Sequence, residues 1–70
     1  LAEAISELPE DTRRVFEMSR FENMKYNDIA QQLGISVNTV KYHIKRALAI
    51  LTEKLGKYLV VALYLYSSTD

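Results

Sequence analysis

The sequence predicts an all-α fold, a small helical bundle with a helix-turn-helix and a long C-terminal helix. Three observations support this class. Only two glycines and one proline interrupt the 70 residues, and one GIS turn separates two strongly helical segments. Apolar residues recur at helical rather than alternating spacing. A chain of this length buries only about 60% of the surface that it exposes when unfolded, so a few helices must share the core.

The first two helices are predicted on either side of Pro9. Residues 1–7 are a short segment rich in Ala and Glu. The second helix is expected to run from Pro9 to about Asn23, with acidic residues in its first turn, where the helix dipole favours them. The side chains expected to be buried are Val15, Phe16 and Met18, with Ile5 and Leu8 from the preceding segment. Those expected to face solvent are Arg13, Arg14, Glu17 and Arg20.

Residues 28–47, DIAQQLGISVNTVKYHIKRA, predict two helices joined by a sharp turn. Asn27 is a candidate N-cap of the first helix, and Gly34 supplies the left-handed backbone that ends it. Ser36 is expected to cap the last helix, which starts at Val37. The side chains expected to point inward are Ile29, Ala30 and Leu33 from the first helix, and Val40, Ile44, Ala47, Leu48, Leu51 and Leu55 from the last.

Ala30 is the most informative residue of this arrangement. It is expected where the two helices cross closely, so a larger side chain would push the last helix away from the angle needed to enter a DNA major groove. A small residue here, a glycine turn and a buried β-branched residue early in the next helix match the helix-turn-helix pattern. The long C-terminal helix is therefore predicted to be a recognition helix.

The charges are divided unevenly along the chain. The net charge is zero, which by itself argues weakly against nucleic-acid binding. Residues 1–33, however, hold four basic and seven acidic side chains, a net charge of −3, whereas residues 34–57 hold five basic residues and one acidic residue, a net charge of +4. Asp70 brings the sum to zero. The basic part supplies an electrostatic footprint for phosphate.

Other classes of function find little support. The chain has no cysteine, so it lacks disulfides and thiolate metal ligands, and a reducing cytoplasm is the expected location. It opens without Met or a signal-like segment, as expected of a domain from a longer protein. His43 has no second His or Cys at ligand spacing, so a packing or phosphate-binding role is favoured over a metal site. No nucleophile pairs with it and no Gly-rich phosphate loop occurs, so we expect neither an enzyme nor a cofactor.

The run LPEDTRRVFEMSRFENMKYNDIAQQLGISVNTVKYHIKRALAIL resembles the C-terminal promoter-binding domain, region 4, of bacterial RNA polymerase sigma factors. It is most similar to the extracytoplasmic-function group, and the resemblance covers about residues 5–55. The output domain of LuxR-type response regulators is the alternative, because it shares the IA-x-x-L-x-IS-x-x-TVK-x-H pattern. The opening LP-x-x-x-R-x-VF and the continuation of the last helix favour the sigma factors.

The resemblance implies that the domain binds the minus-thirty-five element of double-stranded promoter DNA and touches the RNA polymerase core. The exposed face just after the turn fits such binding, because the first turns of a recognition helix contact base edges. The residues expected to read bases are Asn38, Lys41, Tyr42 and Lys45, although cap-region packing is equally credible for Asn38. The residues assigned to phosphates are Arg13, Arg14, Lys25, Tyr26, Ser36, Thr39 and Arg46. Ser36 and Thr39 are first a cap and a first-turn hydroxyl, with phosphate contact as an additional role.

An apolar C-terminal extension, residues 58–70, is predicted to follow the DNA-binding domain of residues 1–57. Residues 59–66 are consecutive apolar or aromatic residues, too short a run to span a membrane, which needs about 20. Either the last helix continues through Gly56, which is the preferred outcome, or Gly56 ends it and the tail folds back. We expect the tail to dock on polymerase or an anti-sigma factor, and to form a homodimer of the isolated domain. The interface residues would be Leu59, Val60, Leu63 and Tyr66. A helical protein-interaction module acting through this tail is therefore a second alternative function.

Overall fold

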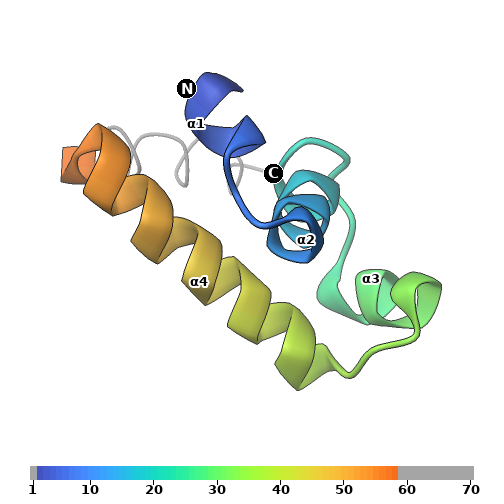
Figure 1. Cartoon of the computed structure of the whole chain (residues 1–70). Helices are drawn as coiled ribbons and strands as arrows, with labels where there is room; N and C mark the ends of the chain where they lie inside the picture. Colours follow the sequence, from blue (N-terminus) through green and yellow to red (C-terminus); the bar gives the residue numbers. More distant parts are fainter. Residues whose placement is uncertain (1, 59–70) are drawn as a thin grey trace.

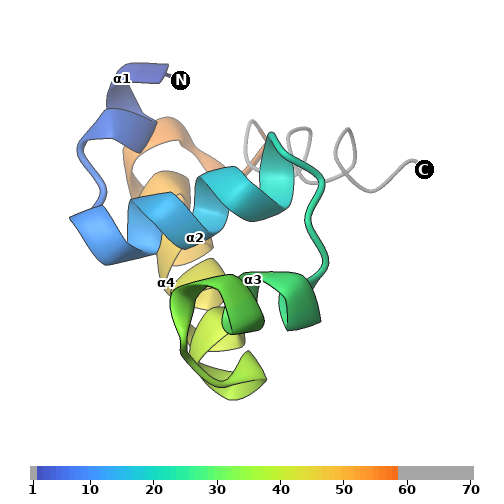
Figure 2. The same ribbon diagram turned by 90° about the vertical axis from the view of Figure 1, so that its right-hand side faces the viewer.

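The structure, a computed structural model, describes residues 2–58 and contains four helices in that range (Figure 1). They are α1 (Ala2–Ser6), α2 (Glu10–Arg20), α3 (Tyr26–Leu33) and α4 (Val37–Leu55). The long helix α4 runs along one side of the other three, with α1 beside its C-terminal half and α3 beside its N-terminal half (Figure 1). Figure 2 shows α2 lying across α4, with α1 and α3 on opposite sides of α2. The all-α class with a helix-turn-helix is confirmed.

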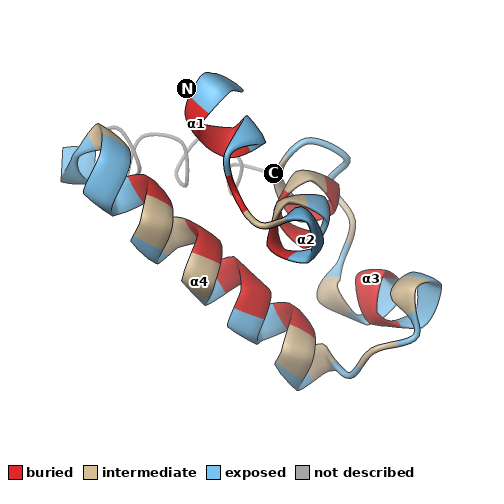
Figure 3. Cartoon of the chain, viewed as in Figure 1, coloured by how far each residue is buried: buried red, intermediate tan, exposed pale blue. Residues whose placement is uncertain are grey.

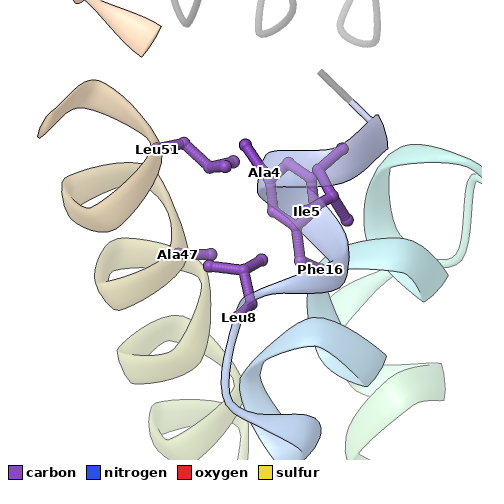
Figure 4. Packing of buried hydrophobic residues seen from close by; sticks show 6 residues of the cluster. All are labelled: Ala4, Ile5, Leu8, Phe16, Ala47 and Leu51. Atoms are coloured by element: carbon purple, nitrogen blue, oxygen red, sulfur yellow. The ribbon is translucent and has the colours of Figure 1, made fainter. Parts of the chain in front are cut away.

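The core consists of two neighbouring groups of buried side chains. The first lies between α1, α2 and the second half of α4, where Ala47 and Leu51 point toward the residues of α1 and α2 (Figure 4). Its members are Ala4, Ile5, Leu8, Phe16, Ala47 and Leu51. The second lies between α2, α3 and the first half of α4, and its members are Val15, Met18, Ile29, Ala30, Val40 and Ile44. The predicted inward stripe of α4 is thus confirmed, although Leu48 and Leu55 are only half-buried.

Helix α2 ends earlier than the sequence suggested. Its last residue is Arg20, and the amide of Phe21 still donates to the carbonyl of Glu17 at 2.9 Å. Asn23, the predicted end, instead adopts a left-handed conformation with φ +56° in the loop that follows. Asn tolerates this region better than most residues. Asn23 therefore lies in the loop after α2, where its left-handed conformation changes the direction of the backbone.

Helix α3 begins earlier than predicted, and the candidate cap Asn27 is wrong. The helix starts at Tyr26, and Lys25 occupies the N-cap position with no side-chain hydrogen bond. The carbonyl of Lys25 accepts from the amide of Ile29 at 3.0 Å, which makes it the first acceptor of the helix. Asn27 therefore already lies within the first helical turn, where its side chain is exposed.

The turn between α3 and α4 follows the prediction. Gly34 has φ +69°, and its amide and that of Ile35 both donate to the carbonyl of Ala30. This is the hydrogen-bonded helix end that a left-handed glycine permits. The side chain of Ser36 then accepts from the amide of Thr39 at 3.0 Å and caps α4. The direction in which α4 leaves the turn is thus fixed by local chemistry.

The other end of α4 differs from the preferred expectation. The helix stops at Leu55, and Gly56 has φ +90°, a conformation that L side chains rarely adopt and that breaks the helix. Continuation through Gly56 is therefore wrong. The interface predicted on Leu59, Val60, Leu63 and Tyr66 lies outside the described residues. Within residues 2–58, no helix is long and apolar enough to cross a membrane.

Candidate nucleic-acid interface

The predicted base-reading residues share one exposed stripe on the first half of α4. Asn38, Lys41, Tyr42 and Lys45 are all exposed, and the spacing i, i+3, i+4, i+7 places them on one face of the helix. Val40 and Ile44, which are buried, lie on the opposite face of the helix. Figure 3 shows that the buried part of α4 faces the other helices. We call these four residues the outer stripe. It combines two cations, an amide and a phenol, and it contains no carboxylate.

The two lysines of the outer stripe are available to a ligand. Among residues 2–58, neither Lys41 nor Lys45 forms an ion pair. Lys54, near the other end of α4, differs because its Nζ donates to Glu7 Oε1 at 2.7 Å. This hydrogen bond lowers the pKa of Glu7 and raises the pKa of Lys54. The positive charge that α4 offers to a ligand is therefore concentrated in its N-terminal half.

The start of α4 is built from two hydroxyl side chains. Ser36 Oγ lies 2.9 Å from Thr39 Oγ1 in addition to accepting from the Thr39 amide. Their first role is thus capping, as predicted. Both lie at the positive end of a long helix, where backbone N–H groups favour an anion. A phosphate contact by these two hydroxyls stays a prediction.

The remaining predicted phosphate contacts are spread over several elements. Arg46 is half-buried on the flank of α4, and Lys25 and Tyr26 lie at the start of α3, where Tyr26 packs against the core. Arg14 lines a hollow with Leu33, Ile35 and His43, so it borders the helix-turn-helix. Arg13 does not line that hollow. It lines another one between α1 and α2 with Ala2, Ile5 and Phe21, on a part of the surface that α1 borders.

One buried arrangement beside the outer stripe was not foreseen from the sequence. Nδ1 of His43 lies 3.0 Å from Oγ1 of Thr12, which joins α4 to α2 through two buried side chains. Nε2 of the same ring lies 4.0 Å from Oδ2 of Asp11. The rings of Tyr42 and His43 pack edge to face, with centroids 5.2 Å apart. The sequence contained a weak signal for it. Thr12 precedes Val15 and Phe16 by about one helical turn, so it is expected on the same buried side of the helix.

His43 therefore packs between α4 and α2, which is one of the two roles that the sequence favoured over a metal site. Its Nδ1 is within hydrogen-bond distance of Thr12 Oγ1, and the residue is only 8% exposed. In the range that the structure describes, no group of three or more His, Cys, Asp or Glu side chains lies close enough to hold a metal ion. The candidate interface thus consists of cations, one amide, hydroxyls and the exposed ring of Tyr42.

Comparison with known protein families gives one result. The model of the family Sigma-70, region 4, matches residues 1–51, which covers all of α1, α2 and α3 and most of α4. No match was found among curated proteins or among solved structures. The family match decides between the two helix-turn-helix families considered above.

Proposed function

Because the chain belongs to the sigma-70 region 4 family, whose helix-turn-helix domains bind DNA in transcription initiation, we propose that it recognises the minus-thirty-five promoter element. In this role it helps direct RNA polymerase to its promoters, and it acts in the cytoplasm. The observation that carries the proposal is the outer stripe, whose exposed cations form no ion pair with residues 2–58 and lie beside a capped and well-defined turn. A recognition helix inserts this part of its surface into the major groove.

The outer stripe offers suitable chemistry for base edges. The ammonium groups of Lys41 and Lys45 donate to guanine O6 or N7, and the amide of Asn38 pairs with adenine N6 and N7. The Tyr42 ring, 56% exposed, packs on a thymine methyl group. Each good bidentate pair with a base discriminates against the wrong base by about 1–3 kcal/mol.

The surrounding cations and hydroxyls position the domain on the DNA backbone. Arg46 lies on the flank of α4 and Arg14 borders the turn, and these positions support phosphate contacts by both residues. The other groups proposed for phosphate are Arg13, Lys25, Tyr26, Ser36 and Thr39. Such contacts raise affinity and fix orientation, and they carry no sequence information directly.

A salt series on DNA binding by the 70-residue chain tests the proposal. A duplex is first selected from a randomised pool, and its affinity is measured as salt concentration rises, together with that of a scrambled duplex. Lys45→Ala is compared with Lys54→Ala, a matched change on the same helix whose lysine is paired with Glu7. We expect Lys45→Ala to reduce preference for the selected duplex and Lys54→Ala to leave it unchanged. Absence of any selected duplex would contradict the proposal.

We propose further that the domain belongs to the extracytoplasmic-function group and contacts the polymerase core. The LP-x-x-x-R-x-VF opening, residues 8–16, supports the subgroup. The apolar extension of residues 58–70 is proposed to dock on polymerase or an anti-sigma factor and, in the isolated domain, on a second copy. Sedimentation of the 70-residue chain beside one truncated after Lys57 tests self-association. A monomer at tens of micromolar in both cases would exclude the dimer.

A further inference from the structure

We infer that Thr12 is a positioning residue for base recognition: acting through His43, its buried hydroxyl on α2 sets the orientation of the Tyr42 ring on α4. The inference rests on the proposed function, because it assumes that the outer stripe reads DNA. It assigns a role in base specificity to a residue that is fully buried and therefore does not contact DNA itself. The contacts that carry it run in one line from α2 to the surface of α4.

The first step is the hydrogen bond between the helices. Thr12 is 0% exposed, and its Oγ1 lies 3.0 Å from His43 Nδ1. The two residues are 31 positions apart, so the bond links α2 to the beginning of the recognition helix. A buried hydrogen bond is costly to leave unmade, because each partner then loses water without gaining a replacement. The bond therefore restricts the rotation of α4 about its own axis relative to α2.

The second step is the direction of that bond. In the neutral imidazole one ring nitrogen donates and the other accepts. His43 Nε2 lies 4.0 Å from Oδ2 of Asp11, and the negative charge of this carboxylate favours the tautomer with the proton on Nε2. Nδ1 is then the acceptor, and the Thr12 hydroxyl donates to it. Asp11 is itself held, because its Oδ1 accepts from the Thr12 amide at 2.7 Å. The two ends of the ring thus have different partners, which disfavours a ring flip.

The third step connects the fixed ring to the outer stripe. The Tyr42 ring packs against His43 at an interplanar angle of 66°, an edge-to-face arrangement. Pairs of this kind shift the population of one rotamer by roughly two- to tenfold. An exposed tyrosine on a helix otherwise divides itself between two χ1 rotamers. Packing on His43 selects one of them before DNA is met, so less ordering is needed on binding.

Two substitutions of Thr12 separate the hydroxyl from the shape of the side chain. Thr12→Val keeps the branched shape and removes the hydroxyl, whereas Thr12→Ser keeps the hydroxyl and removes a methyl group. Affinities of the 70-residue chain are measured for its selected duplex and for duplexes with each base pair changed singly. Thermal melts of every variant ensure that binding is compared among folded chains. Ser19→Ala, which removes another buried hydroxyl from α2, is the matched control.

We expect Thr12→Val to lose roughly three- to tenfold of the preference at the base pair that Tyr42→Ala also affects, with little change elsewhere. Thr12→Ser and Ser19→Ala should keep the parental preference. In a Tyr42→Ala background, Thr12→Val should have no further effect, because the two residues then act through one contact. A purely structural role for Thr12 would weaken binding to all duplexes alike and would add to the loss from Tyr42→Ala.

The single histidine of the chain supplies an independent readout. Its ring ¹⁵N resonances are expected to show the proton on Nε2 in the parent chain and in Thr12→Ser, and the Nδ1 resonance is expected to shift in Thr12→Val, because Nδ1 then accepts no hydrogen bond from Thr12. A proton on Nδ1 in the parent would overturn the inference, as would equal base preference in the parent and Thr12→Val. If the parent selects no duplex, the proposed function fails. If it selects one and Thr12→Val reads it unchanged, only the positioning role fails.

Discussion

The two halves of α4 share one helix and one buried stripe, but they present different chemistry to solvent. In residues 37–46 the outward side chains include the amide, phenol and two cations of the outer stripe. In residues 47–55 the outward side chains are Ala49, Thr52 and Glu53, together with Lys54, which is paired with Glu7. Inward, the first half packs on α2 and α3, and the second half packs on α1 and α2.

The difference indicates that packing and the proposed recognition of DNA depend on different side chains of this helix. Hydrophobic periodicity holds along the whole of α4, because both halves must cover the core (Figure 3). The cations of α4 that form no ion pair within residues 2–58 all lie in the half that directly follows the turn between α3 and α4. We expect the packing of the second half on α1 and α2 to hold the first half at its angle to α3. Substitutions in the second half should therefore change mainly the stability of the fold, and substitutions on the outer stripe should change mainly the affinity for DNA.

The largest effect is expected from Leu51→Ala in the second half. Leu51 on α4 is fully buried against α1 and α2, and truncating such a residue costs about 2–5 kcal/mol of unfolding free energy. DNA binding should fall only because fewer chains are folded. Adding an osmolyte such as trimethylamine N-oxide, which favours the folded state, should restore it. Urea denaturation and DNA affinity in the same buffers measure both quantities.

Thr52→Ala, an exposed change one residue away, is the control and should alter stability little. An unchanged denaturation midpoint for Leu51→Ala would show that the second half does not anchor the helix. Base preference that changes in the osmolyte-stabilised variant would remove the distinction between the two halves.

Ala30→Leu should damage DNA binding more than the loss of any one surface charge. Ala30 is buried where α3 meets the first half of α4, and its carbonyl accepts from both Gly34 and Ile35. A larger side chain overpacks this crossing at a cost of about 1–3 kcal/mol and turns α4 away from its angle. Unlike Leu51→Ala, this variant should not regain affinity in osmolyte. Unchanged melting together with unchanged binding would place Ala30 away from the crossing.

Tyr42→Ala and Lys45→Ala should alter affinity without altering stability, because both side chains are exposed. Each is expected to cost about 1–3 kcal/mol on the selected duplex and to relax preference at one base pair. Arg46→Ala is the comparison on the same half, and it should weaken binding to all duplexes and reduce the salt slope by about 1. Uniform losses for Tyr42→Ala and Lys45→Ala would assign these residues to phosphate contacts.

The sequence predicted best those features that depend on neighbouring residues. The start of α4 was correct because Ser36 and Thr39 form their cap within three positions, and Gly34 carries its conformational preference itself. The predicted start of α3 was wrong because the loop before it contains a hydrogen bond between residues farther apart in the sequence. The Met24 amide donates to the Met18 carbonyl at 3.0 Å. That bond leaves Lys25 at the cap position.

The candidate site divides in the same way. Exposure of the outer stripe followed from the helical period and is confirmed, whereas its contact with DNA stays a prediction. The bond between Thr12 and His43 joins residues that are 31 positions apart and depends on how α2 packs against α4. No local pattern encodes such a distance. The structure was therefore needed to connect a buried hydroxyl to an exposed ring.

The smallest effect is expected at the ion pair that closes the second half of α4 onto the segment after α1. Lys54 Nζ lies 2.7 Å from Glu7 Oε1, and this hydrogen bond lowers the pKa of Glu7 below its ordinary value of 4.5. A carboxylate whose pKa is lower in the folded state stabilises the fold above its unfolded pKa and loses this contribution as pH falls through the folded value. Glu7→Gln should therefore lower the melting temperature slightly near pH 7 and leave it unchanged near pH 3, with Glu3→Gln as the control. The difference should shrink in high salt because both groups are exposed to solvent. Base preference should not change at any pH, because Lys54 lies on the half of α4 that carries no residue of the outer stripe. A shift in base preference on Glu7→Gln would mean that the two halves of α4 are coupled through the helix.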